Sequence, residues 1–320
     1  MTYRSFDTSR LRLFPLAMRD HDLTLDAVLP LERSSAVHPT LLTIADRMLD
    51  ARENDAAAVL MMGAHVLRAG VQRYLIDLID RGMLSCIAMN GAGVIHDFEF
   101  ALIGKTTESV RRYIEDGRFG LWKETGRIND IVRDAHRDGL GLGEAVGKAV
   151  SGGGFPHGDI SVLAAAHRAG IPATIHVGIG YDTTHEHPNF DGAAYGAVSY
   201  TDFLRFTAVV ERLEKGVVMN FGCAVMAPEV FLKALAMARN VAVQDGKSVR
   251  RFAALVCDLK NLPGDIRDEP SKDDPNYYYR PWKTMLSRAV AQGGESFYLR
   301  ADHAESIPQL WTAVVEKDKG

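Results

Sequence analysis

The sequence predicts an α/β protein with a doubly wound, mainly parallel sheet of about six or more strands flanked by helices. One unit recurs along the chain: a short apolar run ends in small or polar residues, and an amphipathic stretch follows. The runs do not alternate in polarity, which is typical of parallel strands covered on both faces. The intervening stretches have apolar residues at three- and four-residue spacing, which indicates helices that cross over between strands. Together these features indicate a Rossmann-like fold.

Six strands are expected, and each ends in a turn of small or polar residues. They cover residues 57–62, 87–89, 174–177, 217–219, 253–256 and 297–299. The turns that follow read MGAHV, NGAGV, GIGYD, NFGCA, CDLKN and RADHA. Ligands of open α/β sheets bind beyond the carboxyl ends of the strands, so we expect a ligand site among these turns.

The predicted organisation is an N-terminal arm and helix over residues 1–50, followed by a single α/β nucleotide-binding domain over residues 51–320. A charged, helix-rich insertion is expected around residues 108–152. Residues 261–280 are rich in Pro and Asp and are expected to form a loop. Long ordered loops in compact domains are often functional.

Composition narrows the class of protein. The 320 residues are 47% hydrophobic, which is enough to bury a full core. A net charge of -4 argues against a nucleic-acid partner. No apolar run approaches the roughly 20 residues of a membrane span, and the N-terminus does not resemble a signal peptide. Three cysteines without a CxxC pair suit a reducing compartment. We therefore expect a cytoplasmic protein that binds neither nucleic acid nor membrane.

Several local motifs each allow two interpretations. GAGVIH and GLGLGE both depart from the G-x-G-x-x-G dinucleotide fingerprint. The stretch YDTTHEHPNFD could hold a divalent metal or could be a polar loop, and we expect no metal site. Cys223 could be a thiol activated at a helix N-terminus or a small buried side chain. The aromatic residues 277–279 could stack on a ligand or form an oligomer interface.

A series of segments resembles the deoxyhypusine synthases, in the same order and over roughly residues 55–315. GAHVLRAGVQRYLIDLIDRGMLSCIAMNGAGVIHDFEFAL is similar to the segment of that family that runs from T-S-N-L-I-S-S-G through a helix to T-A-G-G and an acidic cluster. GVVMNFGCAVMAPEVFLKAL stands where the family has a strand, a glycine triplet and a helix. FAALVCDL and FYLRADHAESIPQLWTAV resemble its last two strands and closing helix.

The resemblance implies an NAD-binding sheet assembled as a homotetramer. It implies an NAD-dependent aminobutyl transferase that oxidises a polyamine such as spermidine and captures the aminobutyl group as a lysine imine. The acceptor would be a lysine-bearing protein or a small diamine. The alternatives are a non-catalytic NAD-binding or scaffold homologue, and a metal- or cysteine-dependent hydrolase built on DTTHEH or Cys223.

The resemblance also assigns residues. Lys283, in RPWKT where the family has S-W-G-K, is the expected catalytic amine. The NAD-contacting positions fall on Ala64, His65, Val66, Leu67, Arg68, Asn90, Gly91, Ala92, His96, Asp182, Gly222, Cys223, Asp258, Leu259, Asp302 and His303. The bare turn 90–93 is expected to let cofactor phosphates and ribose approach the backbone. Substrate binding is expected at Asp97, Glu186, His187 and Trp282, with Asp97, Glu186 and Asp302 lining one negative pocket. The chain departs from the family at Ile95 and His96, which replace two glutamates, and near Pro228, which replaces a histidine.

Overall fold

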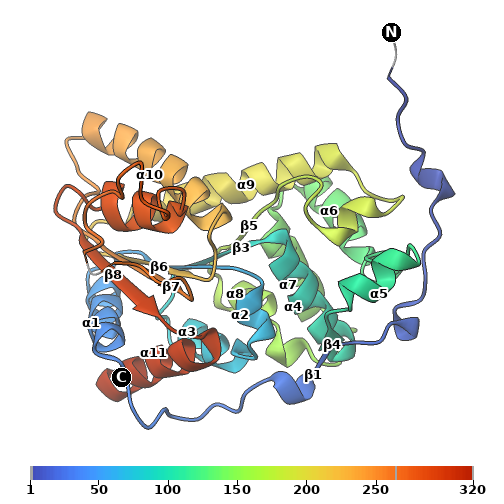
Figure 1. The fold of residues 1–320 in the computed structure, drawn as a ribbon, viewed down its shortest axis with the longest axis horizontal. Coiled ribbons are helices and arrows are strands. Elements are labelled where there is room, and N and C mark those ends of the chain that lie inside the picture. Colours follow the sequence, from blue (N-terminus) through green and yellow to red (C-terminus); the bar gives the residue numbers. More distant parts are fainter. Residues whose placement is uncertain (1–2, 264, 319–320) are drawn as a thin grey trace.

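The computed structural model describes residues 3–263 and 265–318 (Figure 1). Within this part of the chain, the centre is a six-stranded sheet with the order β5-β3-β2-β6-β7-β8, and every neighbouring pair is parallel. The strands are β2 (Ala58–Met62), β3 (Cys86–Asn90), β5 (Ala173–His176), β6 (Val217–Phe221), β7 (Ala253–Asp258) and β8 (Glu295–Arg300). Each of the six predicted apolar runs overlaps one of these strands, and the predicted fold class is confirmed.

The strand order fixes where a ligand can bind. Numbered along the chain, these strands lie in the spatial order third, second, first, fourth, fifth, sixth, which is the order of the doubly wound dinucleotide-binding fold. The connections reverse direction between β2 and β6. Helices that leave these two strands go to opposite faces of the sheet, so a crevice opens between their carboxyl ends.

Helices cover both faces of the sheet (Figure 1). Successive residues of a strand face opposite sides, so Leu60 and Met62 pack into one apolar core while Val59 and Met61 pack into another. Helices α9, α10 and the π-helix η6 cover the second core, and α1, α3, α8 and α11 cover the first. Their bounds are α1 (Pro39–Glu53), α3 (Gln72–Asp80), α8 (Val162–Ala169), α9 (Gly192–Val210), α10 (Met226–Gln244), η6 (Pro281–Arg288) and α11 (His303–Lys317).

The other helices lie in the connections that follow β2 and β3. They are α2 (His65–Arg68), α4 (Gly91–Ile103), α5 (Val110–Glu115), α6 (Arg127–Asp138) and α7 (Leu142–Ser151). Single 3-10 turns occur at Thr8–Arg10, Leu16–Met18, Leu25–Ala27, Gly158–Ile160 and Thr183–Glu186. Helices α5, α6 and α7 fall in the segment where a helical insertion is expected, while the division into an arm and a single domain stays a prediction.

The N-terminal arm lies along the connection between β3 and β5. Its strand β1 (Leu23–Thr24) pairs antiparallel with β4 (Lys105–Thr106), and Phe14 forms a bridge with Trp122. These contacts bring the arm beside α4 and α5 (Figure 1). At the other end of the chain, the described part of residues 261–279 contains no helix or strand. None of the described helices is long and apolar enough to span a bilayer.

Candidate functional site

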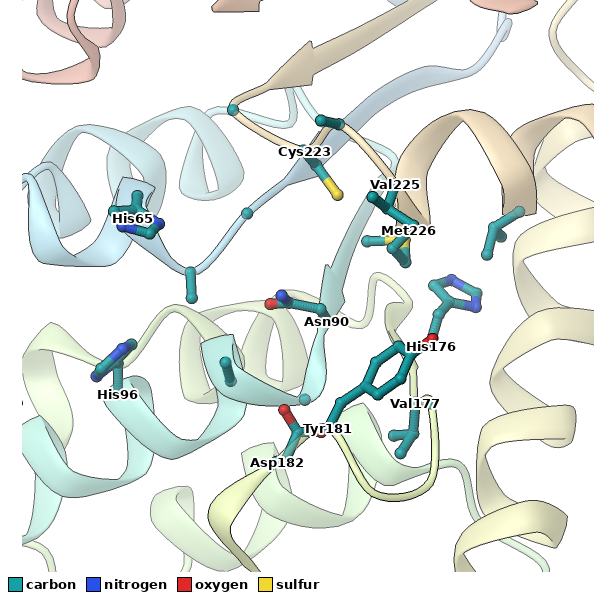
Figure 2. Close-up of a pocket in the computed structure, with 18 of the residues that line it drawn as sticks. His65, Asn90, His96, His176, Val177, Tyr181, Asp182, Cys223, Val225 and Met226 are labelled. Carbon is teal, nitrogen blue, oxygen red and sulfur yellow. The ribbon is translucent and has the colours of Figure 1, made fainter. Parts of the chain in front are cut away.

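A cavity of about 560 Å³ lies at the carboxyl ends of β2, β3, β5 and β6, where the strand order reverses (Figure 2). His65 and His96 lie at one end of the cavity, and Met226 and His176 lie at the other. Ten of the sixteen residues predicted to contact NAD line it: Ala64, His65, Arg68, Asn90, Gly91, Ala92, His96, Asp182, Gly222 and Cys223. These residues come from turns that are far apart in sequence and that a parallel sheet brings together at one edge.

The other six predicted positions lie outside the cavity lining. The side chains of Val66 and Leu67 are fully buried in the core, because the short helix α2 turns them towards the protein interior. The other four follow β7 and β8: Asp258, Leu259, Asp302 and His303. The ring of His303 packs against Gly222 and so stands directly behind the cavity wall.

The bare turn at the start of α4 is occupied by a side chain of the protein itself. A Cβ on Gly91 would clash with the carboxylate of Asp182, and the backbone N–H of Ala92 lies near the same carboxylate and acts to lower its pKa. Asn90 caps the helix by accepting the N–H of Gly93 at 3.2 Å. The turn must therefore be bare to admit Asp182, while the approach of phosphate or ribose at Gly91, which lines the cavity, stays a prediction. Burial raises the pKa of Asp182 to about 6.

The exit of β2 leaves hydrogen-bond donors free. Within the described chain, no acceptor pairs with the backbone N–H of Ala64 or His65. Arg68 contacts His65 through one terminal nitrogen at 3.2 Å, and its buried Nε has no partner among the described residues. Gly222 has a φ of +61°, a conformation that favours glycine. Such a cluster of backbone donors beside a guanidinium is suited to an anion such as a pyrophosphate.

Cys223 is held as a structural residue of the β6 turn. Asn220 accepts its N–H at 3.2 Å and donates to its carbonyl at 2.9 Å, which fixes the turn. The thiol accepts the N–H of Ala227 at 3.3 Å. Burial nevertheless raises the pKa of the thiol above its usual value, so the side chain is not an activated thiolate.

A second cavity, of about 220 Å³, adjoins the first beyond His96. The two cavities share part of their lining: Arg68, Ala92, His96, Tyr181 and Asp182. Helix α4 presents Ala92, Ile95, His96 and Glu99 to the second cavity, at the three- and four-residue spacing of one helix face. The N-terminal arm contributes Arg19, and the start of the insertion contributes Glu108.

A buried ion pair organises the wall of the second cavity. Arg19 donates to Glu99 at 2.5 Å, and both side chains are almost fully buried. Thr106 and Thr125 also donate to this carboxylate, at 2.7 and 2.6 Å. Burial would raise the pKa of Glu99, but the guanidinium and the hydrogen bonds outweigh it and lower the pKa below its usual value. Glu108 accepts the indole N–H of Trp122 at 2.8 Å.

Asp97, where substrate binding was expected, lines neither of the two cavities. Its carboxylate is buried and accepts the hydroxyl of Ser161 at 2.5 Å and the N–H of Val162 at 2.7 Å. It thereby caps the start of α8. Asp97 follows His96 by one position on α4, and neighbouring positions of a helix point in directions about 100° apart, so the side chain leaves the cavity face.

The predicted negative pocket is not assembled, because Asp97, Glu186 and Asp302 line neither cavity. Glu186 is exposed as a whole residue, but its carboxylate is partly desolvated, and this desolvation together with the nearby Glu108 raises its pKa to about 6. Asp302 caps α11 by accepting the N–H of Ala304 at 3.0 Å. The carboxylates that do line the second cavity are Glu99, Glu108 and Asp182.

The histidines of the DTTHEH stretch make separate structural contacts. His187 is buried, and its Nε2 lies 2.8 Å from the carbonyl oxygen of Gly120. The Nδ1 of His185 accepts the N–H groups of Gly180 and Asp182 at 3.0 and 3.2 Å. Across residues 3–263 and 265–318, no three His, Cys, Asp or Glu side chains are grouped so that they could hold a metal ion.

Lys283 and Trp282 lie on η6, away from both cavities. The Lys283 side chain is buried, and its ammonium lies 3.5 Å from the ring centroid of Tyr277. The indole N–H of Trp282 donates to the carbonyls of Ile266 and Asp268, each at 3.0 Å. These contacts hold residues 265–280 against η6, and neither Lys283 nor Trp282 lines a cavity in this arrangement.

Comparisons with known proteins support the fold. No family model matches the sequence, and no curated protein matches it. Among solved structures, an arginine dihydrolase from the ornithine–ammonia cycle in cyanobacteria is similar over 89% of this chain, with 16% identity and a TM-score of 0.50. A conserved LOR/SDH protein from Methanococcus maripaludis S2 is similar over 90% of this chain and 74% of its own, with 14% identity and a TM-score of 0.52.

The chain spans 34% of the arginine dihydrolase, so it corresponds to about a third of that protein. A protein of Entamoeba histolytica assigned as a deoxyhypusine synthase is also similar, over 87% of each chain, with 10% identity and a TM-score of 0.43. The similarities to the arginine dihydrolase and the LOR/SDH protein, at TM-scores of 0.50 and 0.52, support a shared α/β fold. They do not establish membership of the deoxyhypusine synthase family.

Proposed function

We propose that this chain binds NAD in the cavity between β2 and β6 and uses it to oxidise an amine. The observation that carries the proposal is the convergence of ten residues, assigned to NAD by the resemblance to deoxyhypusine synthases, on one cavity at the point where the strand order reverses. Dinucleotides bind at this point in doubly wound folds. The similar solved structures include enzymes, which agrees with a catalytic role.

The free donors of the β2 exit would hold the pyrophosphate. The backbone N–H groups of Ala64 and His65 and the guanidinium of Arg68 supply these donors. The side chain of Asn90, whose oxygen caps α4, keeps its amide N–H groups for a ribose hydroxyl or a carbonyl. When bound, NAD would supply the acceptor for a hydride.

The second cavity would hold the amine. Glu99 is already paired with Arg19, so Glu108 and Asp182 would attract an ammonium group. Ile95, Val110 and Phe119 give the cavity an apolar wall for methylene groups. Asp182 lines both cavities and so would lie between the cofactor and the substrate. A polyamine such as spermidine has this combination of charge and apolar chain.

Transfer of the aminobutyl group through Lys283 is the more specific form of the proposal. The supporting observation is that Lys283 is buried on a π-helix, with its ammonium over the ring of Tyr277. π-helical segments are often found at functional sites. Because Lys283 lines neither cavity, imine formation at this residue requires the 259–280 loop to rearrange when substrate binds.

Titration calorimetry with NAD tests whether the cavity between β2 and β6 binds NAD. Arg68→Gln removes the charge that would face the pyrophosphate, and a charge-assisted hydrogen bond contributes about 1.5–3 kcal/mol, so the affinity should fall at least about tenfold. Arg73→Gln, at an exposed position on α3, is the matched control and should leave the affinity unchanged. A parent protein that binds neither NAD nor NADP refutes the proposal.

Turnover separates the enzyme from a non-catalytic homologue. The NAD-loaded protein should form NADH when spermidine is added, and absorbance records the reaction. Tight NAD binding without NADH formation, from spermidine or from other polyamines, would instead favour the NAD-binding scaffold.

We also propose that the chain forms a homo-oligomer, a tetramer by resemblance. Helices α9 and α10 carry large apolar side chains that are partly exposed, and these support the proposal. They are Tyr200, Leu204, Met237 and Val241, each between 40% and 60% exposed. Large apolar side chains grouped on one surface are typical of protein contacts.

A further inference from the structure

His96 stands where the two cavities meet. It lies on α4, is half-buried, and lines both cavities. Its ring makes one hydrogen bond with the described protein, between Nδ1 and the hydroxyl of Thr106 at 2.9 Å. The direction of that bond decides which ring nitrogen carries the proton, and neighbouring groups fix the direction.

The ionised carboxylate of Glu99 sets the direction. Arg19 donates to Glu99 at 2.5 Å inside the protein, and the pKa of Glu99 is lowered, so the carboxylate can only accept hydrogen bonds. Thr106 has a single hydroxyl proton and lies 2.7 Å from the same carboxylate, so it donates that proton to Glu99. The Thr106 oxygen must then accept from His96, which places a proton on Nδ1.

The Nε2 atom of His96 is therefore left with a lone pair. No described residue forms a hydrogen bond with it, and the side chain lines the cavities. Burial lowers the pKa of His96 to about 4; the charge of Glu99 opposes this effect, whereas Arg68, Arg19 and His65 add to it. The ring is neutral at physiological pH, and Nε2 can only accept a hydrogen bond.

We propose that His96 is a fixed hydrogen-bond acceptor at the junction of the two cavities, and that Arg19 of the N-terminal arm is the positioning residue that sets its tautomer through Glu99 and Thr106. The ligand group that reaches the junction must then present an N–H or O–H donor. An ionised carboxylate or phosphate oxygen has no proton to offer at this position. Only the identification of that donor as an amine rests on the proposed function.

For an amine, the assignment gives His96 a role before oxidation. An amine N–H that points at Nε2 fixes the orientation of the nitrogen relative to Asp182, which lines the same junction. This would be a positioning contact for the substrate, made by a residue that the resemblance assigns to NAD. The chain of contacts from Arg19 through Glu99 and Thr106 to His96 also explains how the N-terminal arm, which lies outside the sheet, could influence ligand binding in the cavities.

Long-range proton–nitrogen NMR correlations of protein labelled with ¹⁵N-histidine test the tautomer directly. The His96 signals are assigned as those missing from His96→Asn. In the ligand-free parent we expect the neutral Nδ1–H pattern, unchanged between about pH 5.5 and about pH 8. Thr106→Ser keeps the hydroxyl and should keep this pattern, whereas Thr106→Val removes the acceptor and should change it. A parent ring that is an Nε2–H tautomer or an imidazolium overturns the inference even if Thr106→Val fails to fold.

A second measurement tests the contact with ligand. When spermidine is added to the NAD-loaded parent, the Nε2 resonance should move while the Nδ1 resonance stays. Thr106→Val should bind spermidine at least about fivefold more weakly than Thr106→Ser, with equal affinity for NAD. Spermidine binding without a change at Nε2 rejects the contact. If NAD binds but spermidine does not, the amine of the proposed function is rejected, and the ligand-free spectrum still decides the tautomer.

Discussion

Asp97 and Asp182 allow a paired test of which buried carboxylates contribute to ligand binding in the two cavities. Burial raises the pKa of each to about 6, but Asp97 caps α8 whereas Asp182 lines both cavities. Replacing each with asparagine removes a titrating group of the same strength and keeps the shape. We expect Asp97→Asn to change only stability and Asp182→Asn to change ligand affinity as well.

The magnitude for Asp97 follows from its pKa, which rises from 3.8 to about 6 on folding. One pKa unit corresponds to about 1.4 kcal/mol, so ionising this carboxyl costs the folded state about 3 kcal/mol. The side chain is 2% exposed, so solvent does not screen the effect. Because the folded state binds the proton more tightly, the stability from this group is present below about pH 3.8 and is lost as pH rises to about 6. Between about pH 4.5 and about pH 7.5 the loss is ~2 kcal/mol.

Urea unfolding at several pH values measures the effect. The free energy of unfolding of Asp97→Asn relative to the parent should rise by ~2 kcal/mol between about pH 4.5 and about pH 7.5, because asparagine does not titrate. Its affinities for NAD and spermidine should equal those of the parent. Asp182→Asn should show a similar relative rise and weaker spermidine binding. A pH-independent difference for Asp97→Asn, or a loss of spermidine binding in that variant, would refute this account.

Three further results are expected. Gly222→Ala should lower the thermal stability more than Gly246→Ala does. Both glycines have a positive φ, but only at Gly222 would the added Cβ clash with the ring of His303. Strain of this kind costs about 1–3 kcal/mol. Equal losses would contradict the clash. Lys283→Ala should bind NAD as tightly as the parent but should form no borohydride-trapped adduct with spermidine. If the variant still forms the adduct, Lys283 is not the nucleophile. Leu204→Glu should lower the mass of the oligomer measured by light scattering, and a monomeric parent rejects the oligomer.

The fold and the place of the cavity could be predicted from sequence for a simple physical reason. Six apolar runs that do not alternate form parallel strands, and parallel strands end at one edge of the sheet. The turns after these runs therefore had to meet, although nothing in any single turn identified a ligand. The G-x-G-x-x-G fingerprint is absent, so the prediction depended on the whole series of turns.

The sequence contained a signal that would have corrected the assignment of Asp97. Residues 92, 95, 96 and 99 have the spacing of one helix face, and this is the face that lines the second cavity. Asp97 falls off that face, and Glu99 falls on it. The expectation that an acid should follow the bare turn chose Asp97 by its position in the sequence, whereas direction on the helix determines which acid lines the cavity.

Arg19 could not have been predicted from local patterns. It lies in an irregular arm without periodicity, 80 positions before the carboxylate that it contacts. The pairing depends on β1 joining β4, two strands of two residues each. Such short strands leave almost no trace in hydropathy, because a two-residue alternation is too short to distinguish from chance.

The position of Asp182 has a consequence for how the dinucleotide would be held. The start of α4 has the positive end of a helix dipole and free N–H groups, which ordinarily attract phosphate. Here the carboxylate of Asp182 lies against Gly91 and close to the N–H of Ala92, so a phosphate at this helix would meet a negative charge. Donors without a partner among the described residues remain at the exit of β2, on Ala64, His65 and Arg68. If the chain binds NAD as proposed, we therefore expect the pyrophosphate at β2, with Asp182 available to an ammonium group where the two cavities meet.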